Sequence, residues 1–214
     1  QGSWGQVFLR VWEGQQVAVK EFFSGADTVM QHREIAVMRH LQMSGSHPNI
    51  LALYAVVLEP ALHLVLEFCT GGTLFDVQFE PEFDSEHRVA VLRQVASAMA
   101  FVHTQHIVHR DLKADNILLR DPVEPGVTPV AKLCDFGLAK DLDGGDDTNT
   151  PLLPSDYMVG VWHAPELEHN LAHGRAVDVY AFGALVADVV LAMGRLGDCW
   201  PPETLRHALR LGKE

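Results

Sequence analysis

Three polar residues close together in the chain, Asp111, Lys113 and Asn116, carry side chains suited to phosphoryl transfer. A carboxylate can orient an attacking hydroxyl and accept its proton, a lysine can neutralise a transferring phosphoryl group, and an amide oxygen can bind a metal ion. Asp135 lies nineteen residues after Asn116 and begins Asp135-Phe136-Gly137, where its carboxylate could hold Mg²⁺. These spacings indicate a site that handles phosphate groups.

Two features near the start of the chain could bind the same phosphates. Gly2 and Gly5 lie in Gly2-Ser3-Trp4-Gly5-Gln6-Val7, and glycines let backbone amides approach phosphate oxygens closely. Lys20 ends the β-prone run Val17-Ala18-Val19 and could place a compact positive charge on those oxygens. The alternatives for these features are an ordinary glycine turn and a solvated lysine.

Short strands and one helix are expected to position these phosphate-binding residues. Apolar runs and turn signals up to residue 70 predict two strand pairs, with Glu13-Gly14 as the turn of the first pair. A three-residue spacing of apolar side chains predicts a helix over about residues 27–41. The expected strands cover Val7–Leu9, Val17–Val19, Ile50–Leu58 and Leu62–Phe68.

Helices dominate after Gly71-Gly72, where we expect a hinge between a strand-rich part and a helical part. Asp84 or Ser85 can cap a helix whose apolar residues recur every three to four positions. A further hairpin and a buried helix are expected at Ile117–Leu119 with Val130–Leu133, and at Ala176–Met193. This order of elements indicates an α+β fold.

Composition excludes several classes of protein. The chain has 214 residues, of which 48% are hydrophobic, so it can bury a core and is not an intrinsically disordered chain. Its formal net charge of −12 would repel phosphate backbones, so nucleic acid is not an expected partner. Three widely separated cysteines predict neither a disulfide framework nor a zinc site. Asp178 and Asp188 interrupt the most apolar stretch, so no membrane-spanning segment is expected in this chain.

The ordered motifs resemble those of the eukaryotic protein kinase family. The resemblance spans essentially the whole chain and rests on His109-Arg110-Asp111-Leu112-Lys113-Ala114-Asp115-Asn116, Asp135-Phe136-Gly137 and Ala164-Pro165-Glu166. It implies one catalytic domain over residues 1–214 with the two-lobed α+β kinase fold. The small lobe, residues 1–70, would be strand-rich with one regulatory helix, and the large lobe, residues 71–214, mainly helical. The family's last helices are expected to lie beyond this sequence, in a longer parent domain.

The resemblance also implies roles for the residues that would transfer phosphate from ATP. Lys20 would pair with Glu34 and hold the α- and β-phosphates. Asp111 would be the catalytic base and Lys113 would meet the γ-phosphate, while Asn116 and Asp135 would bind Mg²⁺. The expected nucleotide-binding residues are Gly2, Gly5, Val7, Ala18, Lys20, Leu66, Glu67, Cys69, Leu118 and Asp135. Among them Leu66 matches the gatekeeper, Glu67 to Cys69 the hinge strand, and Val7, Ala18 and Leu118 the residues that sandwich adenine.

The chain also resembles particular branches of the kinase family, and these branches differ in the hydroxyl group that accepts the phosphate. Lys113, two residues after Asp111, resembles the pattern of Ser/Thr kinases, so Ser and Thr hydroxyls of protein substrates are the expected acceptors. Trp162 before Ala164-Pro165-Glu166 resembles the tyrosine-kinase-like branch. The chain departs from the family at Val159, where a hydroxyl normally bonds the catalytic aspartate and lysine. A pseudokinase that binds nucleotide without transfer therefore stays open, as does a small-molecule kinase of related fold.

Regulation and location are further expectations. Arg110 before Asp111 resembles kinases regulated through their activation segment. A phosphate added by an activating kinase, or by autophosphorylation, would pair with Arg110 if it stood at one of four hydroxyl-bearing residues, Thr148, Thr150, Ser155 or Tyr157. A cytoplasmic, intracellular location is expected, with membrane attachment through another part of the parent protein left open.

Overall fold

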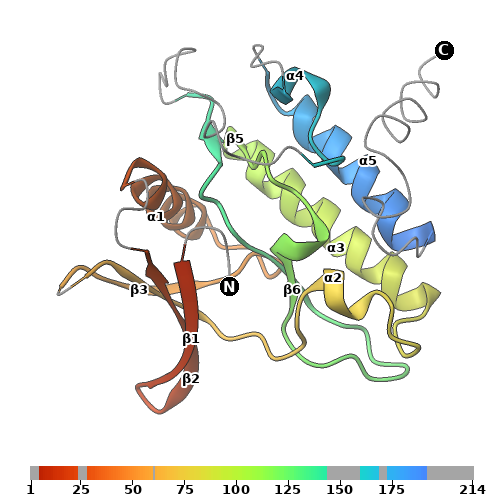
Figure 1. Ribbon diagram of the computed structural model, residues 1–214, viewed down its shortest axis with the longest axis horizontal. Helices are drawn as coiled ribbons and strands as arrows, with labels where there is room; N and C mark the ends of the chain where they lie inside the picture. The colour runs from red at the N-terminus through yellow and green to blue at the C-terminus, as the bar shows by residue number, and fades with distance from the viewer. Residues whose placement is uncertain (1–4, 24–27, 60, 144–159, 169–172, 192–214) are drawn as a thin grey trace.

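A computed structural model describes residues 5–23, 28–59, 61–143, 160–168 and 173–191 of the chain (Figure 1). Its strand-rich part is a four-stranded antiparallel sheet in the order β1-β2-β4-β3. The strands are β1 Gly5–Trp12, β2 Gln15–Phe22, β3 Leu53–Val57 and β4 His63–Glu67. Glu13 and Gly14 form the turn between β1 and β2 with positive φ of 52° and 82°, the backbone that a two-residue hairpin turn requires. The two predicted strand pairs are confirmed.

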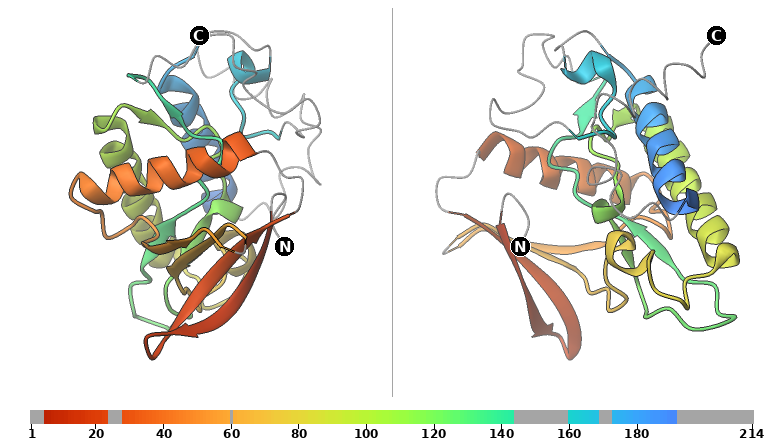
Figure 2. Two further views of the ribbon diagram at one scale, coloured as in Figure 1. Left: turned by 90° about the vertical axis from the view of Figure 1, so that its left-hand side faces the viewer. Right: turned by 45° about the vertical axis from the view of Figure 1, so that its right-hand side comes forward.

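One long helix, α1 Thr28–Met43, lies across this sheet (Figure 2). Its buried side chains are Met30, Glu34, Val37, Met38 and Leu41, so one face packs inward at three- and four-residue spacing. Glu34 is the one charged residue on that face, and its carboxylate contacts Lys20 of β2. The helix expected over residues 27–41 is therefore confirmed with nearly the same bounds.

The second part of the chain is mainly helical. Its helices are α2 Leu74–Val77, α3 Ser85–Thr104, α4 Pro165–Glu168 and α5 Ala176–Leu191. The long helices α3 and α5 lie side by side and pack together (Figure 1). Asp84 caps α3 as predicted, accepting bonds from the backbone N–H groups of Glu86 and His87 at 2.9 Å each. No helix in the described ranges is long and apolar enough to cross a membrane.

Short strands connect the helices with the sheet. β5 Ile107–Val108 pairs with β8 Lys140–Asp141, and β6 Ile117–Leu119 pairs with β7 Ala131–Leu133, all antiparallel. The second pair is the predicted hairpin, and the short 3₁₀ helix η1 Ala114–Asn116 leads into it.

The connection before β3 also pairs with β7. The N–H of Leu51 donates to the Leu133 carbonyl at 2.9 Å, and the N–H of Leu133 donates to the Asn49 carbonyl at 2.8 Å. Asn49 is bound in addition to the Ala131 carbonyl through its side-chain amide at 2.9 Å. One hydrophobic core runs through both parts, because buried residues of α1, β3 and β4 share a cluster with those of α3, β6, β7 and α5. The two-lobed α+β fold class is thus confirmed, and the lobe boundary at residue 70 stays a prediction.

Candidate active site

A buried aspartate of α5 fixes the backbone of the loop that carries Asp111. Asp178, 1% exposed, accepts the N–H of His109 at 2.9 Å and the N–H of Arg110 at 2.8 Å. Its Oδ2 also lies 2.8 Å from Nε2 of His103, in α3. Arg110 has a φ of 68°, a left-handed conformation that a side-chain-bearing residue adopts only when its surroundings hold it there. Asp178 therefore fixes the backbone directly before Asp111, and with it the direction in which the Asp111 side chain points.

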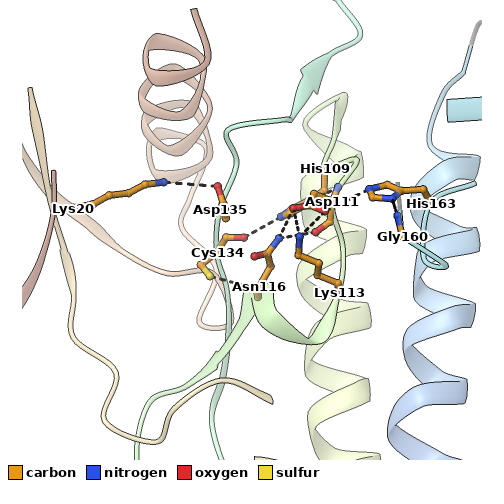
Figure 3. A network of polar contacts seen from close by, with 9 residues as sticks. All are labelled: Lys20, His109, Asp111, Lys113, Asn116, Cys134, Asp135, Gly160 and His163. Carbon is orange, nitrogen blue, oxygen red and sulfur yellow. Dashed lines mark hydrogen bonds and ion pairs between the residues drawn. The ribbon is translucent and has the colours of Figure 1, made fainter. Parts of the chain in front are cut away.

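The Asp111 carboxylate is the centre of a polar network (Figure 3). Lys113 Nζ donates to Oδ2 at 2.9 Å and to Oδ1 at 3.1 Å. The side-chain amide of Asn116 donates to Oδ2 at 2.9 Å and to the main-chain carbonyl of Asp111 at 2.7 Å. Because the Asn116 nitrogen makes both bonds, the side-chain oxygen of Asn116 is the atom left to bind a cation. The three residues predicted from one short motif are brought together by η1.

A second group of charges joins the sheet, α1 and the segment after β7. Lys20 Nζ donates to both oxygens of Glu34 at 2.7 Å and lies 3.7 Å from Oδ1 of Asp135. Burial lowers the pKa of Lys20, but the Glu34 and Asp135 carboxylates outweigh burial and raise this pKa, so the ammonium stays charged. Burial raises the pKa of Glu34, against the lowering effect of Lys20. The Asp135 carboxylate is 33% exposed, which leaves it accessible to a ligand.

The residues expected to surround adenine come from β1, β2, β4 and β6. Ala18 stands opposite Leu66 in the β2–β4 register, and Thr73 forms a bridge with Leu118. Leu66 is buried, whereas Val7 is exposed. Gly5 packs against the Glu21 carbonyl, where a Cβ would overlap the oxygen, so β1 needs glycine there. Gly2, the other expected phosphate-binding glycine, lies outside the described residues.

The strand end after Leu66 is fixed by its own contacts. Oε1 of Glu67 pairs with Lys132 Nζ at 2.8 Å, and Oε2 accepts the N–H of Ala52 at 3.2 Å. Burial, with a smaller contribution from the Glu67 carboxylate, raises the pKa of the Cys69 thiol to about 12, so this thiol stays protonated at neutral pH. The Cys69 side chain is therefore not suited to thiolate chemistry at neutral pH.

Aromatic packing joins the two charge clusters. The His109 and Phe136 rings lie 4.9 Å apart between centroids, and both side chains are fully buried. Nε2 of His109 lies 3.1 Å from the Cys134 carbonyl. Phe136 also belongs to the core cluster that contains Met38 of α1 and Leu53 of β3. The loop of Asp111 and the segment of Asp135 therefore share one rigid support.

Comparison with known proteins decides the family. The chain matches the family described as "Protein kinase domain" over residues 1–195. The chain belongs to the protein kinase family. This confirms the resemblance predicted from the motifs.

Several relatives are themselves protein kinases by name. Calcium/calmodulin-dependent protein kinase type 1B of Homo sapiens is 36% identical over 200 residues, which cover 91% of this kinase chain and 53% of that relative. Serine/threonine-protein kinase PAK mbt of Drosophila melanogaster is 30% identical over 223 residues, covering 94% of the chain and 32% of the relative. Probable serine/threonine-protein kinase zyg-1 of Caenorhabditis briggsae is 33% identical over 189 residues, covering 87% and 25%. The chain spans about half the length of the mammalian relative and less of the other two.

One residue beside the loop of Asp111 was not predicted as a site residue. His163, 1% exposed, has its Nε2 3.6 Å from Oδ1 of Asp111 and its Nδ1 bonded to the N–H of Gly160 at 2.8 Å. Its neighbour Trp162 presents its ring 5.5 Å from Lys113 Nζ. The signal available in the sequence was a histidine directly before Ala164-Pro165-Glu166.

Several predicted positions belong to the segment between β8 and α4. Val159 and the four hydroxyl-bearing residues of the expected activation segment lie outside the described residues, and their roles stay predictions. Arg110, the residue expected to pair with a phosphate there, is 4% exposed. Its Nε donates to the Leu138 carbonyl at 2.5 Å. In this structure the Arg110 guanidinium therefore contacts the backbone just after Asp135-Phe136-Gly137.

Proposed function

We propose that this protein kinase domain transfers the γ-phosphate of ATP to Ser or Thr hydroxyls of protein substrates. The observation that carries the proposal is the Asp111 carboxylate, which Lys113 and Asn116 both contact and which Asp178 positions through the backbone. Two of the relatives are named serine/threonine-protein kinases, which supports the choice of acceptor. Use of ATP fits the intracellular location expected from the sequence.

The donor groups fit Mg²⁺. The side-chain oxygen of Asn116 and the part-exposed carboxylate of Asp135 are hard oxygen ligands, the type that Mg²⁺ prefers. No group of three or more His, Cys, Asp and Glu side chains in the described ranges could hold a metal ion by itself. Asn116 and Asp135 would supply two such ligands, and phosphate oxygens and water would supply the others.

Each side chain of the site has a distinct part in the proposed transfer. Lys20, held by Glu34, binds phosphate oxygens of ATP as a charged ammonium. Asn116 and Asp135 would hold Mg²⁺, which would supply positive charge to balance the phosphate oxygens. Asp111 orients the substrate hydroxyl toward the γ-phosphorus and accepts its proton, and Lys113 compensates the charge on the transferred group. Catalysis on this account is positioning together with charge neutralisation.

The test is transfer of labelled γ-phosphate from Mg·ATP to a mixed protein substrate by the parent protein that contains this chain. We expect label on Ser and Thr, with a loss of at least about 100-fold in the Asp111→Asn variant, because the amide cannot accept the proton. Arg120→Gln, which removes a half-exposed charge paired with Asp121, is the matched control and should leave transfer unchanged. Label on Tyr would overturn the acceptor. Mg·ATP binding without transfer above the Asp111→Asn level would identify a pseudokinase, and labelling of small molecules alone a small-molecule kinase.

A further inference from the structure

A buried histidine contacts the proposed catalytic carboxylate from a segment remote in sequence. We propose that His163 is a positioning residue that orients Asp111, an inference that rests on the proposed kinase function. Figure 3 shows Asp111 between Asn116 and His163. Asn116 donates to Oδ2 of the carboxylate, and His163 Nε2 faces Oδ1 at 3.6 Å. The two side chains therefore address opposite oxygens of the same group.

The hydrogen bond on the far side of the ring determines which nitrogen of His163 carries the proton. Nδ1 accepts the backbone N–H of Gly160 at 2.8 Å, so the neutral imidazole has its hydrogen on Nε2. That N–H faces the Asp111 carboxylate, with which its interaction is attractive. At 3.6 Å the two atoms lie beyond hydrogen-bonding distance, so the contact is a charge–dipole attraction that restrains the carboxylate without immobilising it. The Gly160 bond thus leaves the polar N–H of His163 on the side of the ring that faces Asp111.

The segment that carries His163 has little freedom to move the ring away. His163 is 1% exposed, and its N–H donates to the Gly160 carbonyl at 3.1 Å in a tight turn. A Cβ on Gly160 would overlap the Trp162 ring, so the turn packs directly on that indole. The same indole faces the Lys113 ammonium at 5.5 Å. Adjacent residues of one turn therefore support both members of the Asp111–Lys113 pair.

Two substitutions separate the contact with Asp111 from the contact with Gly160. In His163→Gln, the side-chain NH₂ reaches the position of Nε2 and can donate to Asp111, but the Gly160 acceptor is lost. In His163→Asn, the side-chain oxygen reaches the position of Nδ1 and keeps the Gly160 bond, but nothing reaches Asp111. A residue that only holds the turn would tolerate Asn better than Gln, whereas a residue that positions Asp111 would tolerate Gln better than Asn.

The measurement is steady-state phosphoryl transfer with separate kcat and KM for Mg·ATP. We expect His163→Asn to lower kcat about tenfold with KM for ATP changed less than about twofold, because a displaced carboxylate slows the chemical step and leaves nucleotide contacts intact. His163→Gln should recover most of the lost kcat. Equal kcat in the two variants, or a lower kcat in Gln than in Asn, would overturn the positioning role.

A spectroscopic measurement tests the contact in a way that does not depend on activity. In ¹⁵N-histidine-labelled chain, the His163 signals are those that disappear in His163→Gln. We expect the Nε2–H tautomer, and a shift of these signals in Asp111→Asn but not in Asp143→Asn, which alters the surface partner of His106. A His163 proton on Nδ1, or signals indifferent to Asp111→Asn, would overturn the inference. A wild-type chain that shows the contact but transfers no phosphate would refute the proposed function instead.

Discussion

Removing the ammonium of Lys20 should make the stability of this chain depend on pH in a predictable direction. Both oxygens of Glu34 lie 2.7 Å from Lys20 Nζ, and the two side chains are 5% and 12% exposed. Lys20→Met keeps the aliphatic stem and removes the charge, so the Glu34 carboxylate loses the cation that both its oxygens contact. Breaking a buried ion pair by removing one partner costs about 3–5 kcal/mol. We expect the free energy of unfolding of Lys20→Met to be lower than that of wild type by about 3 kcal/mol at neutral pH, since Lys20 keeps some access to water. We call this difference the deficit.

The sign of the pH effect follows from Glu34. Burial already raises the pKa of this carboxyl above its ordinary value of 4.5, and Lys20→Met removes the opposing effect of the ammonium, so the pKa in the folded variant rises further. A carboxyl whose folded pKa exceeds its unfolded pKa contributes its full stability below the unfolded value and loses it as pH rises through the folded value. The deficit of the variant relative to wild type should therefore grow with pH, by at most about 1.4 kcal/mol per pH unit.

Urea unfolding of wild type and Lys20→Met at pH 5.5 and pH 8 measures this deficit directly. The double variant Lys20→Met/Glu34→Gln is the matched control, because its amide cannot ionise and its unfolding free energy relative to wild type should depend less on pH. A deficit of the same size at both pH values, or one that the double variant shares in size and slope, would refute the argument. Either result would mean that Glu34 is not held as a buried charge by Lys20.

Two further outcomes can be checked on the folded chain. Gly71→Ala should lower the melting temperature, by about 2–4 °C for each kcal/mol of strain, because its Cβ would overlap the backbone carbonyl of Asp121. Gly183→Ala is the control, because a Cβ there meets open space beside α5 and should not lower the melting temperature. Equal melting temperatures for the two variants would contradict this prediction. Cys69, whose pKa burial raises to about 12, should react with iodoacetamide at pH 8 much more slowly in the folded chain than in urea, as mass spectrometry of its peptide would show; equal rates would contradict the assigned burial.

Local sequence signals predicted the elements well. The Glu13-Gly14 turn fixed the β1–β2 hairpin, because its two residues adopt the positive φ that such a turn needs. Asp84 or Ser85 was predicted as the cap of α3, and Asp84 is the cap. Its reciprocal partner His87 was not predicted, since glutamate or glutamine is the usual residue at that position. The clustering of Asp111, Lys113 and Asn116 was predictable because all three belong to one short motif.

Contacts between distant segments were not predictable from a single sequence. The Glu67–Lys132 ion pair and the bond from Asn49 to the Ala131 carbonyl join residues far apart in the chain, the latter 82 positions. His163 was missed for the same reason, since it lies 52 positions after Asp111 and only the three-dimensional fold brings the two side chains together. The pairing of Lys20 with Glu34 was expected only through family resemblance, since no local pattern joins a strand to the following helix.

The backbone pairing of residues 49–51 with β7 determines whether the chain can be divided into two stable fragments. Leu51 and Leu133 are both buried, and each donates its N–H to a carbonyl on the other segment. A chain divided after residue 70 would leave these groups in β7 without their partners, at a cost of about 1–3 kcal/mol for each buried group left unpaired. These bonds, together with the shared core, therefore couple the unfolding of the sheet to that of the helical part.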